Sequence, residues 1–200
     1  KNYLSAPHVT QFDEADITTL EEFRKQLNEE YKKAEIKITP LAFLIKACVF
    51  ALKKFPEFNA SIDGGNLVYK KYYNIGFAAD TPNGLVVPIV KSADQKSVLE
   101  ISKEILDLSK RARDNKLKLE EMKGATITIT NIGSVGGTYA TPIINHPEVA
   151  ILGMYKIQDR LELTAQGTVT SRKYMNFTIT ADHRLIDGAV AARFLKSFLE

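Results

Sequence analysis

A strand that passes directly into a helix near the end of the chain constrains the fold more than any other feature. Residues 174–181 alternate polar and apolar side chains, which is the pattern of a strand with one buried face. After Gly188, apolar residues recur four positions apart, as on one face of an amphipathic helix. The strand face comprises Met175, Phe177, Ile179 and Ala181, and the helix face comprises Val190, Phe194 and Phe198. We therefore expect a rigid strand end followed at once by a helix start.

The junction between these two runs carries a candidate base. His183 stands four residues before Asp187, at the rim of the expected strand. A neutral imidazole held there can act as a general base near pH 7. A histidine near an aspartate is also common as a surface pair or a satisfied polar contact, so spacing alone leaves both interpretations open.

The rest of the chain mixes helices and strands without regular alternation. Thr18 and Thr19 each stand three residues before a glutamate, which predicts a capping box and a first helix. Thr39-Pro40 predicts a second, buried helix that ends before Pro56, and Ser97 caps a third. Strands are expected over residues 72–79, 85–90, 125–132, 149–156 and 174–181, with turns at 81–84 and 166–167. This order favours an α+β layered domain over a doubly wound sheet.

Composition limits the class of protein. The chain has 200 residues, 44% of them hydrophobic, which suits one globular domain with a sizeable core. The net charge of +3 comes from scattered basic residues, which indicate solvated faces and no nucleic-acid partner. No apolar stretch approaches the length of a membrane span, because Lys46 interrupts the longest candidate.

Cys48 is the only cysteine of the chain. An intrachain disulfide and a thiolate metal cluster are therefore excluded, and a reducing compartment is the simplest inference. Cys48 lies in the apolar run 41–52, where a thiol usually behaves as a small core hydrophobe. His8 and His146 both stand beside prolines without a second ligand at metal spacing, so we interpret them as structural and predict no metal.

Several blocks of sequence resemble one known family. They are His183–Gly188 (HRLIDG), Thr128–Thr138 (TITNIGSVGGT), Pro142–Gly153 (PIINHPEVAILG) and Asp80–Pro88 (DTPNGLVVP). They are similar to the dihydrolipoyl acyltransferase core of 2-oxo acid dehydrogenase complexes, a family that shares its fold with chloramphenicol acetyltransferase. The resemblance extends from about Pro7 to the last residue. It implies a two-layer α/β sandwich with a mixed sheet, and residues 1–200 as a catalytic domain whose lipoyl and subunit-binding domains lie elsewhere in a longer protein.

The resemblance also implies a reaction, the transfer of an acyl group, acetyl in the first instance, from dihydrolipoamide to coenzyme A. His183 would take the proton from the coenzyme A thiol, a step for which a positioned base typically contributes about 10²–10⁴-fold. Thr130 matches a hydroxyl residue, usually Ser, that donates a hydrogen bond to the charged oxygen of the tetrahedral intermediate. Asp187 would orient the site, make a structural ion pair or cap the last helix.

Substrate contacts and partners follow from the same resemblance. Arg24 matches an arginine that contacts coenzyme A, and Asp80 and Asn131 are assigned to the same binding site. The glycines Gly133, Gly136 and Gly137 match neither the dinucleotide nor the Walker spacing and favour a close backbone approach instead. The lipoyl group would be carried on a separate domain.

The expected assembly is a homotrimer with the active site between subunits, His183 of one chain facing Thr130 of another. Such trimers would join into a cage that binds lipoyl domains and the dehydrogenase components of the complex. The expected location is the bacterial cytoplasm, with the mitochondrial matrix as the alternative.

Three other functions stay open. The chain could transfer a branched-chain acyl group, because the block over residues 142–153 resembles acetyl-transferring and branched-chain members more than succinyl-transferring ones. It could be a chloramphenicol-type acetyltransferase, although that family usually has His-His where this chain has Asp182-His183. It could also be an inactive scaffold, which would need none of His183, Asp187 and Thr130.

Overall fold

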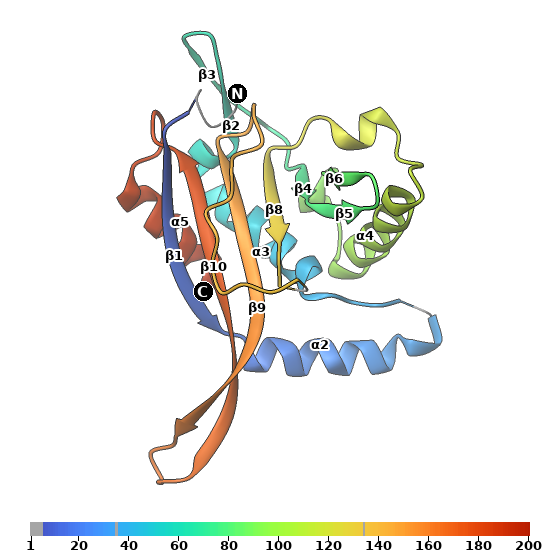
Figure 1. The fold of residues 1–200 in the computed structure, drawn as a ribbon, viewed down its shortest axis with the longest axis vertical. Coiled ribbons are helices and arrows are strands. Elements are labelled where there is room, and N and C mark those ends of the chain that lie inside the picture. The colour runs from blue at the N-terminus through green and yellow to red at the C-terminus, as the bar shows by residue number, and fades with distance from the viewer. Residues whose placement is uncertain (1–5, 35, 134) are drawn as a thin grey trace.

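A mixed sheet forms the centre of the molecule (Figure 1). The computed structural model describes residues 6–34, 36–133 and 135–200. Within these ranges the sheet has six strands in the order β1-β10-β9-β8-β4-β7. They are β1 (His8–Asp16), β4 (Ile75–Phe77), β7 (Ile89–Val90), β8 (Ile127–Asn131), β9 (Ala150–Leu163) and β10 (Val169–Asp182). β8 runs parallel to β9 and β4, and the other pairs are antiparallel, which confirms the predicted α+β domain with a mixed sheet.

Helices cover one face of this sheet. In Figure 1, α3 (Pro40–Lys54) and α5 (Gly188–Leu199) lie behind the strands, α4 (Val98–Arg113) lies at the edge of the molecule that contains β5 and β7, and α2 (Thr18–Glu30) crosses below. We call the covered face the helix face. It buries side chains that alternate along the strands, among them Ile127, Ile129, Leu152, Phe177 and Ile179. Within the described ranges, no helix is long and apolar enough to cross a bilayer.

Short elements complete the chain. Two hairpins lie outside the main sheet, β2 (Ala60–Asp63) with β3 (Asn66–Tyr69), and β5 (Ala79–Thr81) with β6 (Gly84–Val86). Four 3-10 turns are found in the described part, η1 (Lys32–Ala34), η2 (Pro56–Phe58), η3 (Ala93–Gln95) and η4 (Leu119–Met122). The hairpin of β5 and β6 confirms the turn expected at residues 81–84.

The three helices predicted from these sequence signals are found, but the cap of the first differs from the prediction. α3 begins at Pro40 after an extended Thr39, and Ser97 forms a full capping box with Glu100 at the start of α4. The capping box expected at Thr18 or Thr19 is wrong, because α2 starts at Thr18 after Ile17 without a side-chain cap. There the Thr18 hydroxyl donates to Asp16 of β1, so a strand residue takes the place of the local cap.

The strands β9 and β10 run well beyond their predicted ends. They form a long hairpin whose turn includes Gly167 in the left-handed region (φ 77°), as expected for residues 166–167. β1 was not predicted from sequence and pairs along β10 from His8↔Asp182 to Asp16↔Tyr174.

The second face of the sheet, which we call the open face, has no helix over it among the residues that the structure describes. The segment 135–149 crosses it instead, in front of β10 in Figure 1. The Tyr155 hydroxyl donates to the Ala140 carbonyl (2.9 Å) and forms a hydrogen bond with Thr178 (2.8 Å). A Cβ at Gly153 would lie 2.5 Å from that Tyr155 hydroxyl, so only glycine fits there. The segment is therefore held by polar contacts.

Candidate active site

His183 is the first residue after β10, in the turn that leads to α5. Its backbone N–H donates to the Pro7 carbonyl (2.7 Å), and its side chain is exposed. The neighbouring side chains form an ion pair, with Arg184 Nη2 at 2.6 Å from Asp182 Oδ2. The Arg184 backbone N–H also donates to Asp182 (3.0 Å). The turn is thus fixed on both sides of an exposed imidazole, and the role of His183 as a base stays a prediction.

Asp187 caps α5. Its Oδ1 accepts a hydrogen bond from the Val190 N–H (2.8 Å), and its backbone is extended as a helix cap requires. Of the three roles that the sequence left open, the structure therefore shows the capping role. A part in orienting the reaction stays a prediction.

Thr130 lies near the end of β8 and is half-buried. In the register of the sheet it stands beside Gly153, which in turn stands beside Thr178 of β10. Alternation along the strand places Thr130 on the open face with Thr128, whereas Asn131 points to the helix face. Among the described residues the Thr130 hydroxyl forms no hydrogen bond, so its proton can be donated to a ligand.

A single chain does not bring His183 and Thr130 together. Thr130 is level with Thr178, and His183 is five residues further along β10. At about 3.3 Å per residue, the two lie roughly 16 Å apart along the sheet, and two strands apart across it. A base and a hydrogen-bond donor that act on one thioester must both lie within about 3 Å of the reacting atoms.

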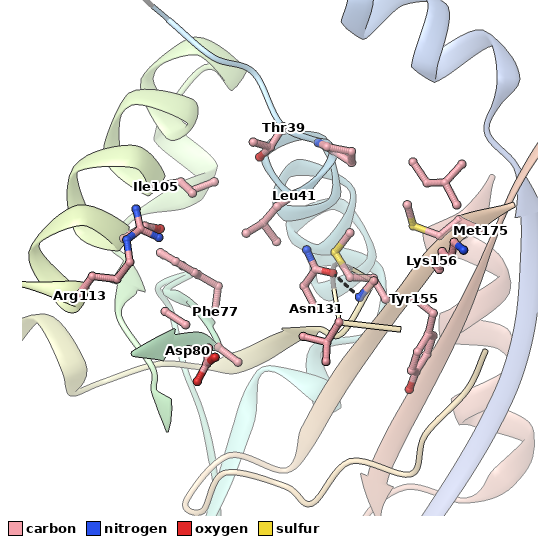
Figure 2. A pocket seen from close by; sticks show the side chains of 18 residues that line it. Thr39, Leu41, Phe77, Asp80, Ile105, Arg113, Asn131, Tyr155, Lys156 and Met175 are labelled. Atoms are coloured by element: carbon pink, nitrogen blue, oxygen red, sulfur yellow. Dashed lines mark hydrogen bonds between the residues drawn. The ribbon is translucent and has the colours of Figure 1, made fainter. Parts of the chain in front are cut away.

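Asp80 and Asn131, by contrast, line the same cavity. This cavity has a volume of about 600 Å³ and opens on the helix side of β8, between α3, α4 and β5 (Figure 2). Its walls are largely apolar and include Leu41, Phe77, Ile105, Met154 and Met175. Asn131 Oδ1 accepts from the Gly133 N–H (2.9 Å), which leaves the amide nitrogen of Asn131 as a donor for a ligand. The cavity suits a molecule with an apolar body and a few polar groups.

Arg24 belongs to a different hollow, between α2 and the chain that follows it. That hollow has a volume of about 700 Å³, and its lining includes four cationic side chains, Arg24, Lys25, Lys32 and Lys37. The Arg24 guanidinium is held by Glu21 through two hydrogen bonds of 2.7 and 2.8 Å. The excess of positive charge suits a phosphorylated ligand.

Several residues of these sites could not be identified from the sequence. Arg113 and Lys156 line the cavity that contains Asp80, and the ring of Tyr155 lies beside Gly153 on the open face. Glu148 is buried, and burial raises its pKa to about 7. Glu148 stands in one of the blocks that carry the family resemblance, but a single glutamate gives no sign of being buried.

Other sequence predictions concern residues outside these sites. Cys48 is fully buried, and burial raises its pKa to about 12, which confirms a core thiol. His8 joins β1 to the segment on the open face, since its Nε2 accepts from the Ile144 N–H (3.1 Å). In the part of the chain that the structure describes, no group of three His, Cys, Asp or Glu side chains could hold a metal ion.

Comparison with known proteins identifies the family. Residues 1–200 match the family described as 2-oxoacid dehydrogenases acyltransferase (catalytic domain), and the chain belongs to it. A relative from Cupriavidus necator is 58% identical over 194 residues, 97% of this chain and 35% of the relative. One from Bacillus subtilis is 50% identical over 193 residues, 96% of this chain and 43% of the relative. Both are named dihydrolipoyllysine-residue acetyltransferase component of pyruvate dehydrogenase complex, and the chain spans less than half of their length.

Solved structures agree. The dihydrolipoamide acetyltransferase of Azotobacter vinelandii superposes with a TM-score of 0.93 at 45% identity, covering 98% of this chain and 82% of that one. The cubic core of a pyruvate dehydrogenase multienzyme complex gives 0.93 at 46% identity, with the same shares covered. A chloramphenicol acetyltransferase gives 0.62 at 17% identity, covering 97% of this chain and 87% of that one, which shows a shared fold only.

Proposed function

We propose that this chain is the catalytic domain of a longer protein that transfers an acetyl group from dihydrolipoamide to coenzyme A in a pyruvate dehydrogenase complex. The observation that carries the proposal is the exposed imidazole of His183, fixed in a rigid turn at the end of β10. The names of the two bacterial relatives support the acetyl group and the complex. Their bacterial origin supports the cytoplasm as the location.

The chemistry needs a base and a hydrogen-bond donor from this chain. His183 accepts the proton of the coenzyme A thiol, so that the thiolate can attack the thioester carbon of acetyl-dihydrolipoamide. Thr130 donates a hydrogen bond to the oxygen that becomes negatively charged. When the carbon–sulfur bond to dihydrolipoamide breaks, His183 returns its proton to the departing sulfur. No metal is required for any of these steps.

The Azotobacter vinelandii enzyme offers a parallel for these roles. A serine, a histidine and an asparagine of that enzyme were investigated for their role in its catalytic mechanism, and the histidine and asparagine are four positions apart. His183 and Asp187 have the same spacing, and Thr130 precedes His183 by nearly the distance that separates that serine from its histidine. An asparagine can cap a helix but carries no charge. The parallel therefore favours an orienting or capping role for Asp187 over an ion pair, which would need its charge.

Substrate binding is divided between two sites. The hollow with Arg24 supplies cations for the phosphates of coenzyme A. Asp80 and Asn131 contact the substrate arm from the cavity beside β8, where one can accept and the other donate a hydrogen bond. The dihydrolipoyl group arrives on a separate lipoyl domain.

The separation of His183 from Thr130 supports an active site shared between chains of a homotrimer. Trimers would assemble into a cage, as the cubic core among the similar structures suggests, with the dehydrogenase components bound around it. The test is to mix inactive His183→Ala chains with inactive Thr130→Ala chains under verified subunit exchange. Some interfaces of mixed trimers then contain both intact residues, so activity returns. No recovery, or a monomer by light scattering, would exclude the shared site.

Thioester exchange tests the reaction itself. The chain is incubated with dihydrolipoamide and acetyl, isobutyryl or succinyl coenzyme A, and with chloramphenicol as a control acceptor. We expect transfer from acetyl coenzyme A to dihydrolipoamide only. Faster transfer of isobutyryl would assign the chain to branched-chain substrates. Acetylation of chloramphenicol would assign it to the antibiotic-modifying class. If no acyl group is transferred, the chain is an inactive scaffold.

A further inference from the structure

A carboxylate is buried in the open face, where the proposed reaction does not use it. Glu148 is 4% exposed and stands two residues before β9. Its Oε1 accepts hydrogen bonds from the Thr128 hydroxyl (2.9 Å) and from the Asn145 amide (2.9 Å). Its Oε2 is buried and has no hydrogen-bond partner among the described residues. Burying such a group costs free energy unless it is partnered, so its place in the open face calls for a reason.

Through its hydrogen bond with Thr128, Glu148 contacts the strand that also carries Thr130. Both threonines lie on β8, two residues apart, and therefore on the same face of the sheet. Thr128 is 1% exposed and also lies close to β4, because a Cβ at Gly76 would lie 2.9 Å from the Thr128 hydroxyl oxygen. A buried side chain that is hydrogen-bonded to Glu148 restricts the rotation of β8 about its axis. That rotation sets the direction of the Thr130 hydroxyl.

The same short segment also reaches the end of β10. Glu148 is followed by Val149, whose carbonyl accepts a hydrogen bond from the Asp182 N–H (2.9 Å). Asp182 in turn holds Arg184 and precedes His183. The chain entering β9 is thus tied to β8 by a side chain and to β10 by its backbone.

We propose, on the basis of the proposed function, that Glu148 is a positioning residue that orients Thr130 by holding Thr128 of the same strand, β8, in place. The interaction needs an acceptor at Oε1 and does not need a negative charge. Burial raises the pKa of Glu148 to about 7, although Thr128, Asn145 and the half-buried Lys70 act in the opposite direction. The uncharged form is therefore abundant at neutral pH, and glutamine is its close mimic.

Three single variants and one double variant test the proposal in the exchange of acetyl coenzyme A with dihydrolipoamide. Glu148→Ala and Thr128→Val should each lower kcat by roughly 10–100-fold with little change in KM. A displaced donor stabilises the transition state less well but hardly affects binding of the substrate. Glu148→Gln should retain kcat, because its amide oxygen accepts the same two hydrogen bonds. The double variant Thr128→Val with Glu148→Ala should lose no more than either single variant.

A matched control separates positioning from loss of packing. Thr180 is another fully buried threonine of the open face. Its hydroxyl forms a hydrogen bond (2.9 Å) with that of Thr10 on β1, which pairs with the other edge of β10. Thr180→Val should lower the free energy of unfolding as Thr128→Val does, yet leave kcat unchanged. If Glu148→Ala does not fold, Thr128→Val and Glu148→Gln still decide the question.

Several outcomes would overturn the inference. Wild-type kcat in Thr128→Val, or equal losses of kcat in Thr128→Val and Thr180→Val, would show that Glu148 contributes only to packing. A loss in Glu148→Gln as large as in Glu148→Ala would exclude the acceptor role. Lack of exchange by the wild-type chain would overturn the proposed function and this inference together, whereas these variant results overturn the inference alone.

Discussion

The two faces of the sheet are stabilised by different chemistry. On the helix face, alternate residues such as Ile129 and Leu152 are apolar and pack beneath α3 and α5. On the open face, many of the buried residues are polar, among them Thr128, Thr178 and Glu148, under a segment without helix or strand. Apolar burial is stabilising in almost any close-packed geometry, but each buried polar group needs a partner at a defined distance. The open face is therefore the one on which positions are tightly specified, and it carries Thr130.

The largest expected effect lies at neither face. His183→Ala should lower the rate of acetyl exchange by about 10²–10⁴-fold, because the base is lost. The side chain is exposed, so the free energy of unfolding and the assembly should not change. Exchange kinetics and denaturant unfolding measure the two quantities. Turnover near that of the wild type would rule out the mechanism.

Next in size is the effect of the open-face hydroxyl. Thr130→Ala should lower kcat by roughly 10²–10³-fold with little change in KM, which is the usual cost of removing a donor to an oxyanion. Thr130→Ser keeps the hydroxyl and should stay active. If the alanine and serine variants have the same kcat, the hydroxyl is not the donor.

Ile129, which precedes Thr130 and points to the helix face, should affect stability and leave kcat unchanged. Ile129 is fully buried, and Ile129→Ala should lower the free energy of unfolding by about 2–5 kcal/mol through lost burial and a cavity. The kcat of the folded fraction should stay within the range of the wild type. Thermal or urea unfolding and exchange kinetics on the same preparation give both values. A collapse of kcat without loss of stability would contradict the division between the two faces.

The smallest predicted effect is a pH dependence of stability from the open face. Burial raises the pKa of Glu148 from its ordinary 4.5 to about 7 in the folded chain. Between these values the folded state holds a proton that the unfolded state releases, so the free energy of unfolding falls as pH rises. The contribution is complete below pH 4.5 and is lost above pH 7.

The measurement for this last prediction compares wild type with Glu148→Gln in urea at pH 5 and pH 8. The wild type should lose on the order of 2 kcal/mol more than the variant over this interval. Equal pH dependence in the two proteins would show that Glu148 does not titrate there.

Sequence patterns predicted some helix starts of this chain correctly and missed other elements. Ser97 and Glu100 predicted the start of α4 because the capping box is made within one turn. The same pattern failed at Thr18 because other local partners compete: the Thr18 hydroxyl donates to Asp16, two residues away, and Glu21 pairs with Arg24, three residues away. β1 escaped prediction because its strand character comes from pairing with β10, more than 150 residues away in the chain.

The candidate site shows the same limit. The sequence by itself determined which groups are available, a histidine between a strand and a helix, a hydroxyl at the end of a strand, and the family to which their blocks belong. Only the tertiary structure decided that Asp80 and Asn131 share a cavity, that His183 and Thr130 lie far apart in one chain, and that Glu148 is buried against Thr128. Periodicity and caps depend on residues a few positions apart. Burial, partners and distances depend on which remote strands lie side by side, and no single segment contains that information.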